Sequence, residues 1–199
     1  MHALLKFSNA VDWLNTRIGK YAIWLILAST VISGVNAVIR KAFGTSSNAY
    51  LEVQWYLFAA SFLIVSGYTL LNNEHVRIDV VSSRLSKRGQ IWVDVIGFTC
   101  FLTPFCAAML WFGVPFFYRG FVSGEMSGNA GGLIRWPVYA MIPLGFSLLL
   151  LQGWSELIKR IAFLQGLIED PTIKKVEKTA EEELAESIRR LAESKTKAA

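Results

Sequence analysis

The chain has 199 residues, a mean hydropathy of +0.41, 53% hydrophobic residues and only 18% charged residues. A soluble domain usually carries about 25% charged residues, spread along its whole length. Here the charges are clustered, so the composition excludes a soluble enzyme, a secreted disulfide scaffold and a nucleic-acid-binding domain. In a chain that crosses a membrane, the Lys and Arg residues that give the net charge of +5 indicate how the spans are oriented before they indicate a ligand.

The first 20 residues have an amphipathic pattern. Apolar residues recur at helical spacing at Leu4, Phe7, Val11, Leu14 and Ile18. Polar residues fill most of the other side: Lys6, Asn9, Asp12, Asn15 and Arg17. The pattern predicts an interfacial helix over 1–20 that lies in the headgroup plane and then turns into the membrane. Two interpretations stay open, an anchor for the first span and a brace beneath a partner subunit.

Four stretches without Asp, Glu, Lys or Arg follow, at 21–39, 53–73, 95–118 and 136–155. A helix needs about 20 apolar residues to cross a hydrocarbon core of about 30 Å. The sequence therefore predicts an all-α membrane protein with four transmembrane helices, at about 21–39, 53–73, 95–118 and 136–158. Pro104 and Pro115 are expected to kink the third span. The membrane domain would cover 21–165, and 166–199 would be a charged cytosolic tail containing a helix.

The basic residues indicate how the spans are oriented. Before, between and after the four spans there are 3, 2, 4, 2 and 9 Lys and Arg residues. Because cytoplasmic segments are enriched in Lys and Arg, both termini and the middle loop are predicted to be cytoplasmic.

Residue types that carry cofactors are scarce. The only histidines are His2 and His75, and the only cysteines, Cys100 and Cys106, both fall in the third span. These numbers exclude haem, zinc and iron–sulfur sites, so no cofactor is expected in this chain. The glycine run from Gly120 to Gly132 lacks the Gly-Lys-Ser/Thr ending of a phosphate loop. It is predicted to be a loop, with close backbone packing as the alternative.

Ionisable residues are absent from the middle of every predicted span, where a substrate or ion pathway would need them. Three acids stand at span ends, each near basic residues that could pair with it. The expected partners are Arg40 or Lys41 for Glu52, Lys87 or Arg88 for Asp94, and Lys159 or Arg160 for Glu156. This distribution predicts a membrane-embedded helper that does not itself carry substrate.

Two segments resemble one known family. The first opens with Glu52-x-x-Trp55-Tyr56-Leu57-Phe58 and ends with His75-Val76-Arg77-Ile78-Asp79-Val80-Val81 and Arg84-Leu85. The second runs from Gly128 to Pro137-Val138-Tyr139-Ala140-Met141-Ile142-Pro143-Leu144-Gly145. Their order and spacing resemble the small membrane subunit, DctQ type, of tripartite ATP-independent periplasmic (TRAP) transporters. The similarity covers about residues 20–165.

The resemblance implies a subunit of a secondary uptake system in the bacterial cytoplasmic (inner) membrane. A periplasmic binding protein would deliver an organic acid to a large multi-span membrane subunit, which would hold the substrate and sodium sites. The small subunit would brace the large one and contact the binding protein and membrane lipids, but no nucleic acid. A stand-alone exporter is the alternative, but it would need a carboxylate inside a span. The second alternative is a membrane enzyme that acts on lipid, whose only candidate cluster is Glu74, His75, Arg77 and Asp79.

The resemblance also gives candidate inter-subunit or structural residues. Glu52 and Trp55 would lie near the outer surface, as a docking contact or as an interfacial anchor pair. A polar knot at the cytoplasmic end of the second span would comprise His75, Arg77, Asp79 and Arg84, in which an Arg–Asp pair fixes the helix end. The entry to the fourth span would be shaped by Gly128, Pro137, Tyr139 and Pro143.

Overall fold

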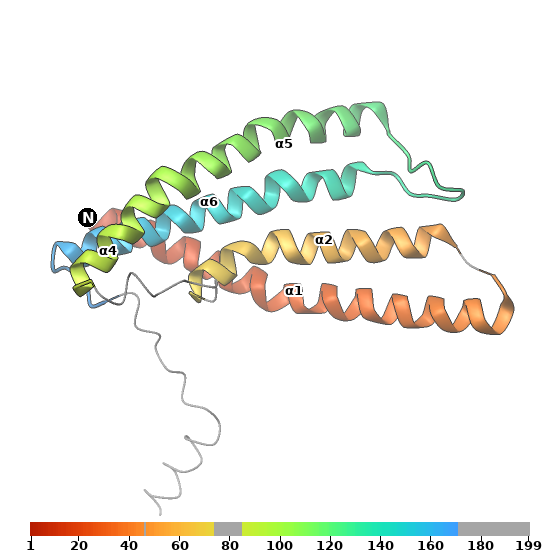
Figure 1. The fold of residues 1–199 in the computed structure, drawn as a ribbon, viewed down its shortest axis with the longest axis horizontal. Coiled ribbons are helices and arrows are strands. Elements are labelled where there is room, and N and C mark those ends of the chain that lie inside the picture. The colour runs from red at the N-terminus through yellow and green to blue at the C-terminus, as the bar shows by residue number, and fades with distance from the viewer. Residues whose placement is uncertain (46, 74–84, 171–199) are drawn as a thin grey trace, which may run out of the picture.

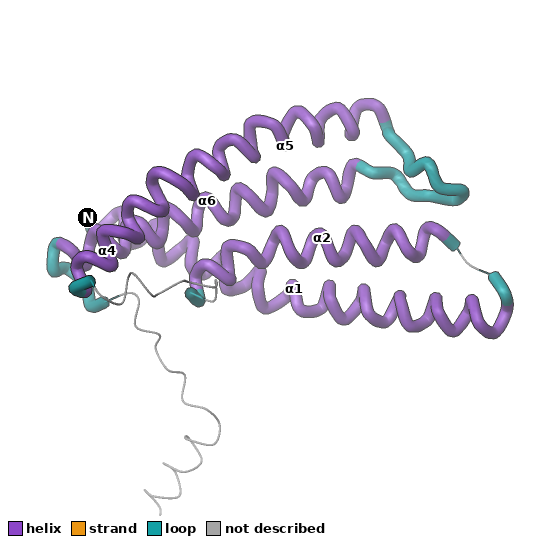
Figure 2. Tube along the Cα trace, in the orientation of Figure 1, coloured by secondary structure: helices purple, strands orange, loops and turns teal. Residues whose placement is uncertain are grey.

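The computed structural model describes residues 1–45, 47–73 and 85–170. Within these ranges the chain is helical, with connecting loops and no strand (Figure 2). The helices are α1 (His2–Phe43), α2 (Asn48–Leu71), α4 (Lys87–Gly97), a π-helical turn η1 (Phe98–Leu102), α5 (Thr103–Ser123) and α6 (Trp136–Leu164). Four segments are long and apolar enough to cross a membrane, with α4, η1 and α5 forming one of them. The predicted all-α membrane protein with four spans is confirmed. The cytosolic helix expected in the tail lies outside the described residues.

The first helix differs from the sequence prediction. α1 is one uninterrupted helix of 42 residues, so the turn expected near residue 20 is absent. At 1.5 Å per residue it is about 63 Å long, roughly twice the hydrocarbon thickness. The region holds no proline, and Gly19 serves close packing, since a Cβ there would lie 2.3 Å from the Tyr68 ring. That residues 1–20 lie in the headgroup plane stays a prediction.

The third span continues through a change of hydrogen bonding, the π-helical turn η1, without a break. Thr103 donates its backbone N–H to the carbonyl oxygen of Phe98, five residues earlier, and its Oγ1 donates to the same oxygen at 2.8 Å. Pro104 follows directly and has no N–H to offer to the preceding turn. The π-helical turn inserts one residue there, which relieves the clash between the proline ring and that turn. Pro115, the second expected kink, lies inside α5 without ending it.

The spans form a row in the order α1, α2, α6, α5 (Figure 1). Among the described residues α5 packs on α6 but contacts neither α1 nor α2, so the four spans do not close into a bundle. The first half of α1 also contacts α6, and Figure 1 shows it passing behind α6 toward the end where α4 begins. We call that end the terminal end, and the opposite end, which carries the α1–α2 and α5–α6 connections, the loop end.

Apolar and polar side chains are distributed as in a membrane protein. Trp111 on α5 is 78% exposed, whereas Gln152 and Arg160 on α6 are fully buried. In water this arrangement would be unfavourable, because large apolar patches would be solvated and polar groups buried. It is stable where the surroundings are lipid or a membrane partner.

The α2–α6 contact depends on one glycine. A Cβ at Gly145 would lie 2.7 Å from the carbonyl oxygen of Leu63. Because backbone cannot move aside as a side chain can, we expect Gly145→Ala to destabilise the chain by about 1–3 kcal/mol. Gly34→Ala is the matched control, since nothing lies within 4 Å of its Cβ position. A lower melting temperature in detergent for G145A alone is the expected result, and equal melting temperatures would contradict the packing.

Candidate functional site

Glu52, in the first turns of α2, is the centre of a polar site at the loop end. Its carboxylate is only 4% exposed although it faces a loop. It accepts hydrogen bonds from the Ser127 hydroxyl, from Asn129 Nδ2 at 2.8 Å and from the backbone N–H of Leu133 at 2.7 Å. We call Glu52, Ser127, Asn129 and the Leu133 backbone the loop-end site. Charge-assisted bonds of this kind are stronger than bonds between neutral groups, so Glu52 binds three points of the α5–α6 connection firmly to α2.

The α5–α6 connection is itself an ordered hairpin. Gly124 ends α5 with φ +60°, and Met126 and Ile134 form an antiparallel bridge. Backbone bonds run from Ser127 N to Leu133 O at 2.8 Å and from Arg135 N to Glu125 O at 2.9 Å. Two further α2 side chains reach the hairpin, Asn48 to the carbonyl of Ala130 at 3.0 Å and Tyr56 to that of Ile134 at 3.2 Å. Residues 124–132 of the glycine-rich run therefore form a loop, as predicted, and this loop is pinned to α2. Gly120 lies in α5 instead, where a Cβ would lie 2.5 Å from the Tyr139 ring, so the alternative of close packing holds there.

A pocket of about 270 Å³ lies beside this hairpin. Its lining includes Glu52, Trp55 and Tyr139, three of the residues singled out from the sequence. Glu125 and Arg135 form an ion pair at 3.2 Å next to it, and the Tyr139 hydroxyl donates to Glu125 Oε1 at 3.1 Å. Both members of the ion pair are well exposed, so they present opposite charges at the surface of the loop end.

The other candidate residues fall in different places. Pro137 stands in the first turn of α6, where its missing N–H costs no hydrogen bond. Gly128 is in the hairpin, and Pro143 is inside α6, near Gly113 of α5. The expected knot of His75, Arg77, Asp79 and Arg84 lies outside the described residues. For all these residues a part in subunit contacts stays a prediction.

A second, larger polar cluster lies at the terminal end, where α1 crosses α6. We call it the polar network; its members are Ser8, Asp12 and Asn15 of α1, Asp94 of α4, and Gln152, Ser155, Glu156, Lys159 and Arg160 of α6.

Gln152 and Asp12 connect the two helices of this network. Gln152 accepts from Asn15 Nδ2 at 2.9 Å and donates to Asp12 Oδ1 at 2.9 Å. Asp12 also accepts from the Ser155 hydroxyl at 2.8 Å and pairs with Lys159 at 2.9 Å. Together these bonds fix how the first half of α1 is rotated against α6.

Arg160 joins α6 to α4. Its side chain is fully buried, pairs with Glu156 and donates from Nε to Asp94 Oδ2 at 2.9 Å. Its guanidinium also lies over the Phe98 ring, 4.7 Å from the centroid. A guanidinium over an aromatic face is attracted by the ring, so the charge has three favourable neighbours.

Sequence reasoning found only part of these partners. Glu156 pairs with both Lys159 and Arg160, the two bases expected for it. Asp94 pairs with Arg160, which we had not expected, and Glu52 is held by Ser127, Asn129 and Leu133 rather than by Arg40 or Lys41. The α1 members were missed. The sequence does hold a signal for this contact, namely a polar stripe with helical spacing on each helix. The stripes are at 8, 12 and 15 on α1 and at 152, 155 and 159 on α6.

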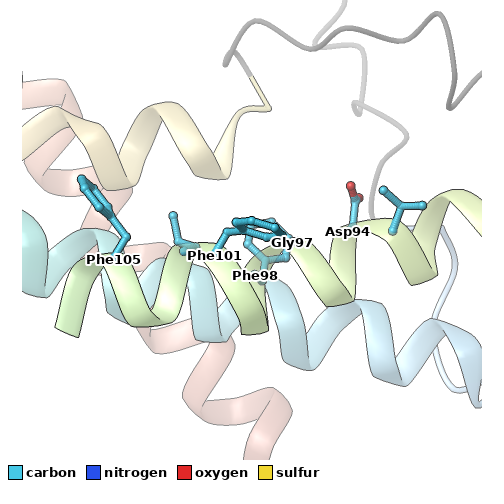
Figure 3. Close-up of a pocket in the computed structure, with 7 residues that line it drawn as sticks. Asp94, Gly97, Phe98, Phe101 and Phe105 are labelled. Atoms are coloured by element: carbon cyan, nitrogen blue, oxygen red, sulfur yellow. The ribbon is translucent and has the colours of Figure 1, made fainter. Parts of the chain in front are cut away.

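A pocket of about 640 Å³ is an open groove along α4, η1 and α5 (Figure 3). Phe98, Phe101 and Phe105 line it, and Asp94 stands at one end. The described residues that line the groove offer no polar side chain besides Asp94. Nor do the described residues hold a group of three or more His, Cys, Asp or Glu placed for a metal ion.

Comparison with known proteins gives one match. A family model described as "Tripartite ATP-independent periplasmic transporters, DctQ component" matches residues 29–163, more than half of the chain. No curated protein and no solved structure matches the chain. The matched range runs from the middle of α1 almost to the end of α6. It includes the loop-end site and the α4 and α6 members of the polar network, but not the α1 members Ser8, Asp12 and Asn15.

Proposed function

Because the chain belongs to the DctQ component family of tripartite ATP-independent periplasmic transporters, we propose that it is the scaffold subunit that braces the large transport subunit. The family is a transporter component, not an enzyme, and its match confirms the resemblance seen in the sequence. In this proposal the transporter takes up an organic acid in symport with sodium, and a periplasmic binding protein delivers the acid. Substrate and sodium bind to the large subunit.

One observation supports the proposal that the large subunit, and not this chain, binds the substrate. No Asp, Glu, Lys, Arg or His lies in the described parts of 21–39, 53–73, 95–118 or 136–155. The four acids of the described helices, Asp12, Glu52, Asp94 and Glu156, lie at the loop-end site and in the polar network, where each bonds to other residues of the same chain. A pathway for an organic anion and sodium would need polar groups near the bilayer centre. The open row of helices, with apolar surface outward, favours a subunit that packs against another.

The loop-end hairpin supports contact with the periplasmic side of the assembly. In the predicted orientation, with both termini cytoplasmic, it faces the periplasm of a bacterial inner membrane. Its backbone is already ordered by Glu52, so docking would not have to order a long loop. The exposed Glu125–Arg135 pair offers both charge signs to a partner.

Affinity purification of the tagged chain from its native membrane tests this function. We expect a much larger polytopic protein in about equal amounts, because the apolar outward faces need a membrane partner. Recovery of the chain alone, or only as a homo-oligomer, would contradict the scaffold role.

Reconstitution then separates bracing from transport. Liposomes holding only this chain should show no sodium-driven uptake of four-carbon dicarboxylates, keto acids, sialic acid or sulfonates, since the described spans offer no charged site for them. Liposomes holding the co-purified subunit as well, with the binding protein outside, should take up one of these acids. Robust uptake by the chain alone would overturn the proposal.

A further inference from the structure

The first half of α1 is packed with polar side chains toward the protein. Ser8 and Asn15 are fully buried against α6, whereas Phe7 and Leu14 point outward and are about two-fifths exposed. Asp12 is drawn inward as well, by Ser155, Gln152 and Lys159. Of the apolar residues that define the amphipathic pattern, Val11 alone is buried in the protein, so what surrounds this half of α1 must accommodate apolar groups.

The outward side also carries a basic face. Lys6, Trp13, Arg17 and Lys20 are all exposed, and we call these four residues the basic face of α1. At 100° per residue they fall within an arc of about 60°. Among the described residues none of the three cations forms an ion pair; the Arg17 guanidinium lies over the Trp13 ring, 5.3 Å from the centroid. Asp12 is the only acid before Glu52, and it bonds to α6, so no acid in the first 51 residues offsets the positive charge of this face.

Along the same arc of α1 the chemistry changes at residue 20. Beyond it the arc continues through Trp24, Val31, Val35 and Val38, all of them more than half exposed. A face that is basic and aromatic over one part and wholly apolar over the next matches the change from headgroups to hydrocarbon in a lipid leaflet. The α6 residues that hold this part of α1, Gln152 to Lys159, lie across the end of the uncharged stretch of that span and so at the same boundary.

We propose that the basic face of α1 binds the headgroups of anionic phospholipids, whose acyl chains lie along Trp24 and Val31. Three cations without a matching acid attract a negative phosphate, and Trp13 suits the headgroup level. An acidic protein partner would match the charges, but it would not match the continuous apolar face beyond residue 20. The proposal does not depend on the transport function.

Quenching of Trp13 fluorescence by brominated phospholipids tests the proposal. The full-length chain is placed in nanodiscs with equal fractions of brominated phosphatidylglycerol or brominated phosphatidylcholine. The contribution of Trp13 is the difference between the wild type and Trp13→Phe. We expect quenching that corresponds to a preference of roughly 5-fold or more for the anionic lipid, since one Lys or Arg at an anionic surface contributes about that factor. Absence of quenching by either lipid, or equal quenching by both, would overturn the proposal.

Matched variants and salt identify the cause of the preference. K6Q/R17Q/K20Q should abolish it, whereas R40Q/K41Q, which removes exposed charges at the other end of the same helix, should leave it unchanged. Raising the salt to about 1 M should abolish it in the wild type as well, because the Debye length falls to about 3 Å. The salt arm needs no variant, so it stands even if the triple variant does not fold. A preference that survives both changes would refute a role for these charges.

Discussion

Replacement of Arg160 by Met is expected to lower the free energy of unfolding by about 3–5 kcal/mol, as does removal of one partner from a buried ion pair. Arg160 is fully buried, and its guanidinium bonds to Glu156 of its own helix and to Asp94 of α4. Met has similar length but no charge, so a nearly fully buried Glu156 would keep only Lys159 as a cationic partner. The loss should appear as a fall of about 10 °C in the melting temperature of the purified chain.

Two comparisons distinguish this effect from the loss of any arginine. Arg119→Met, at an exposed position of α5, should change the melting temperature little. The double variant R160M/E156L removes both charges of the pair and should lose much less stability than the two single changes added together. Two results would contradict this role of the polar network. One is a loss of stability in R160M as small as in R119M, and the other is a loss in the double variant equal to the sum of the losses in the two single variants.

The polar network also shows how far the sequence could predict this molecule. The number of spans and their approximate places follow from charge spacing, because charged residues are costly in hydrocarbon and the chain confines them to the ends. The continuity of α1 could not be predicted in the same way. Whether a helix turns at the membrane surface depends on what holds its first half, and here Ser8, Asp12 and Asn15 bond to α6.

The same limit applies to the loop-end site. From its position before an uncharged stretch, Glu52 is predicted to lie near the membrane surface, and in the structure it lies in the first turns of α2 at the loop end. Its partners are 75–81 residues away in the sequence and include a backbone N–H, which leaves no trace in residue identity. Pairing by proximity in sequence instead favoured Arg40 and Lys41. Contacts between distant segments, especially those made by backbone groups, needed the structure.

The second large effect is expected at Glu52. In Glu52→Gln one carboxylate oxygen becomes an NH₂ group, which would face a donor, either the Leu133 N–H or the pair Ser127 and Asn129. A hydrogen bond to a charged group contributes about 1.5–3 kcal/mol, and a buried donor left without an acceptor adds a further cost. We therefore expect the hairpin from Glu125 to Arg135 to open locally while the spans stay folded, because the rest of α2 keeps its contacts with α1 and α6.

Hydrogen exchange measures this opening directly. The Ser127 amide donates to Leu133 O and the Leu133 amide donates to Glu52. Both amides should exchange roughly 30-fold faster or more in E52Q, since lowering the free energy of opening by about 2 kcal/mol corresponds to that factor. Glu125→Gln is the matched control, because it loses only an exposed ion pair and should change the exchange of these amides much less.

In the assembled transporter, E52Q should weaken docking of the periplasmic protein and still co-purify with the large subunit, because the apolar outward faces of the spans are unchanged. Equal exchange in both variants would mean that Glu52 does not hold the hairpin, and loss of the large subunit in E52Q would place the inter-subunit contact at the loop end instead.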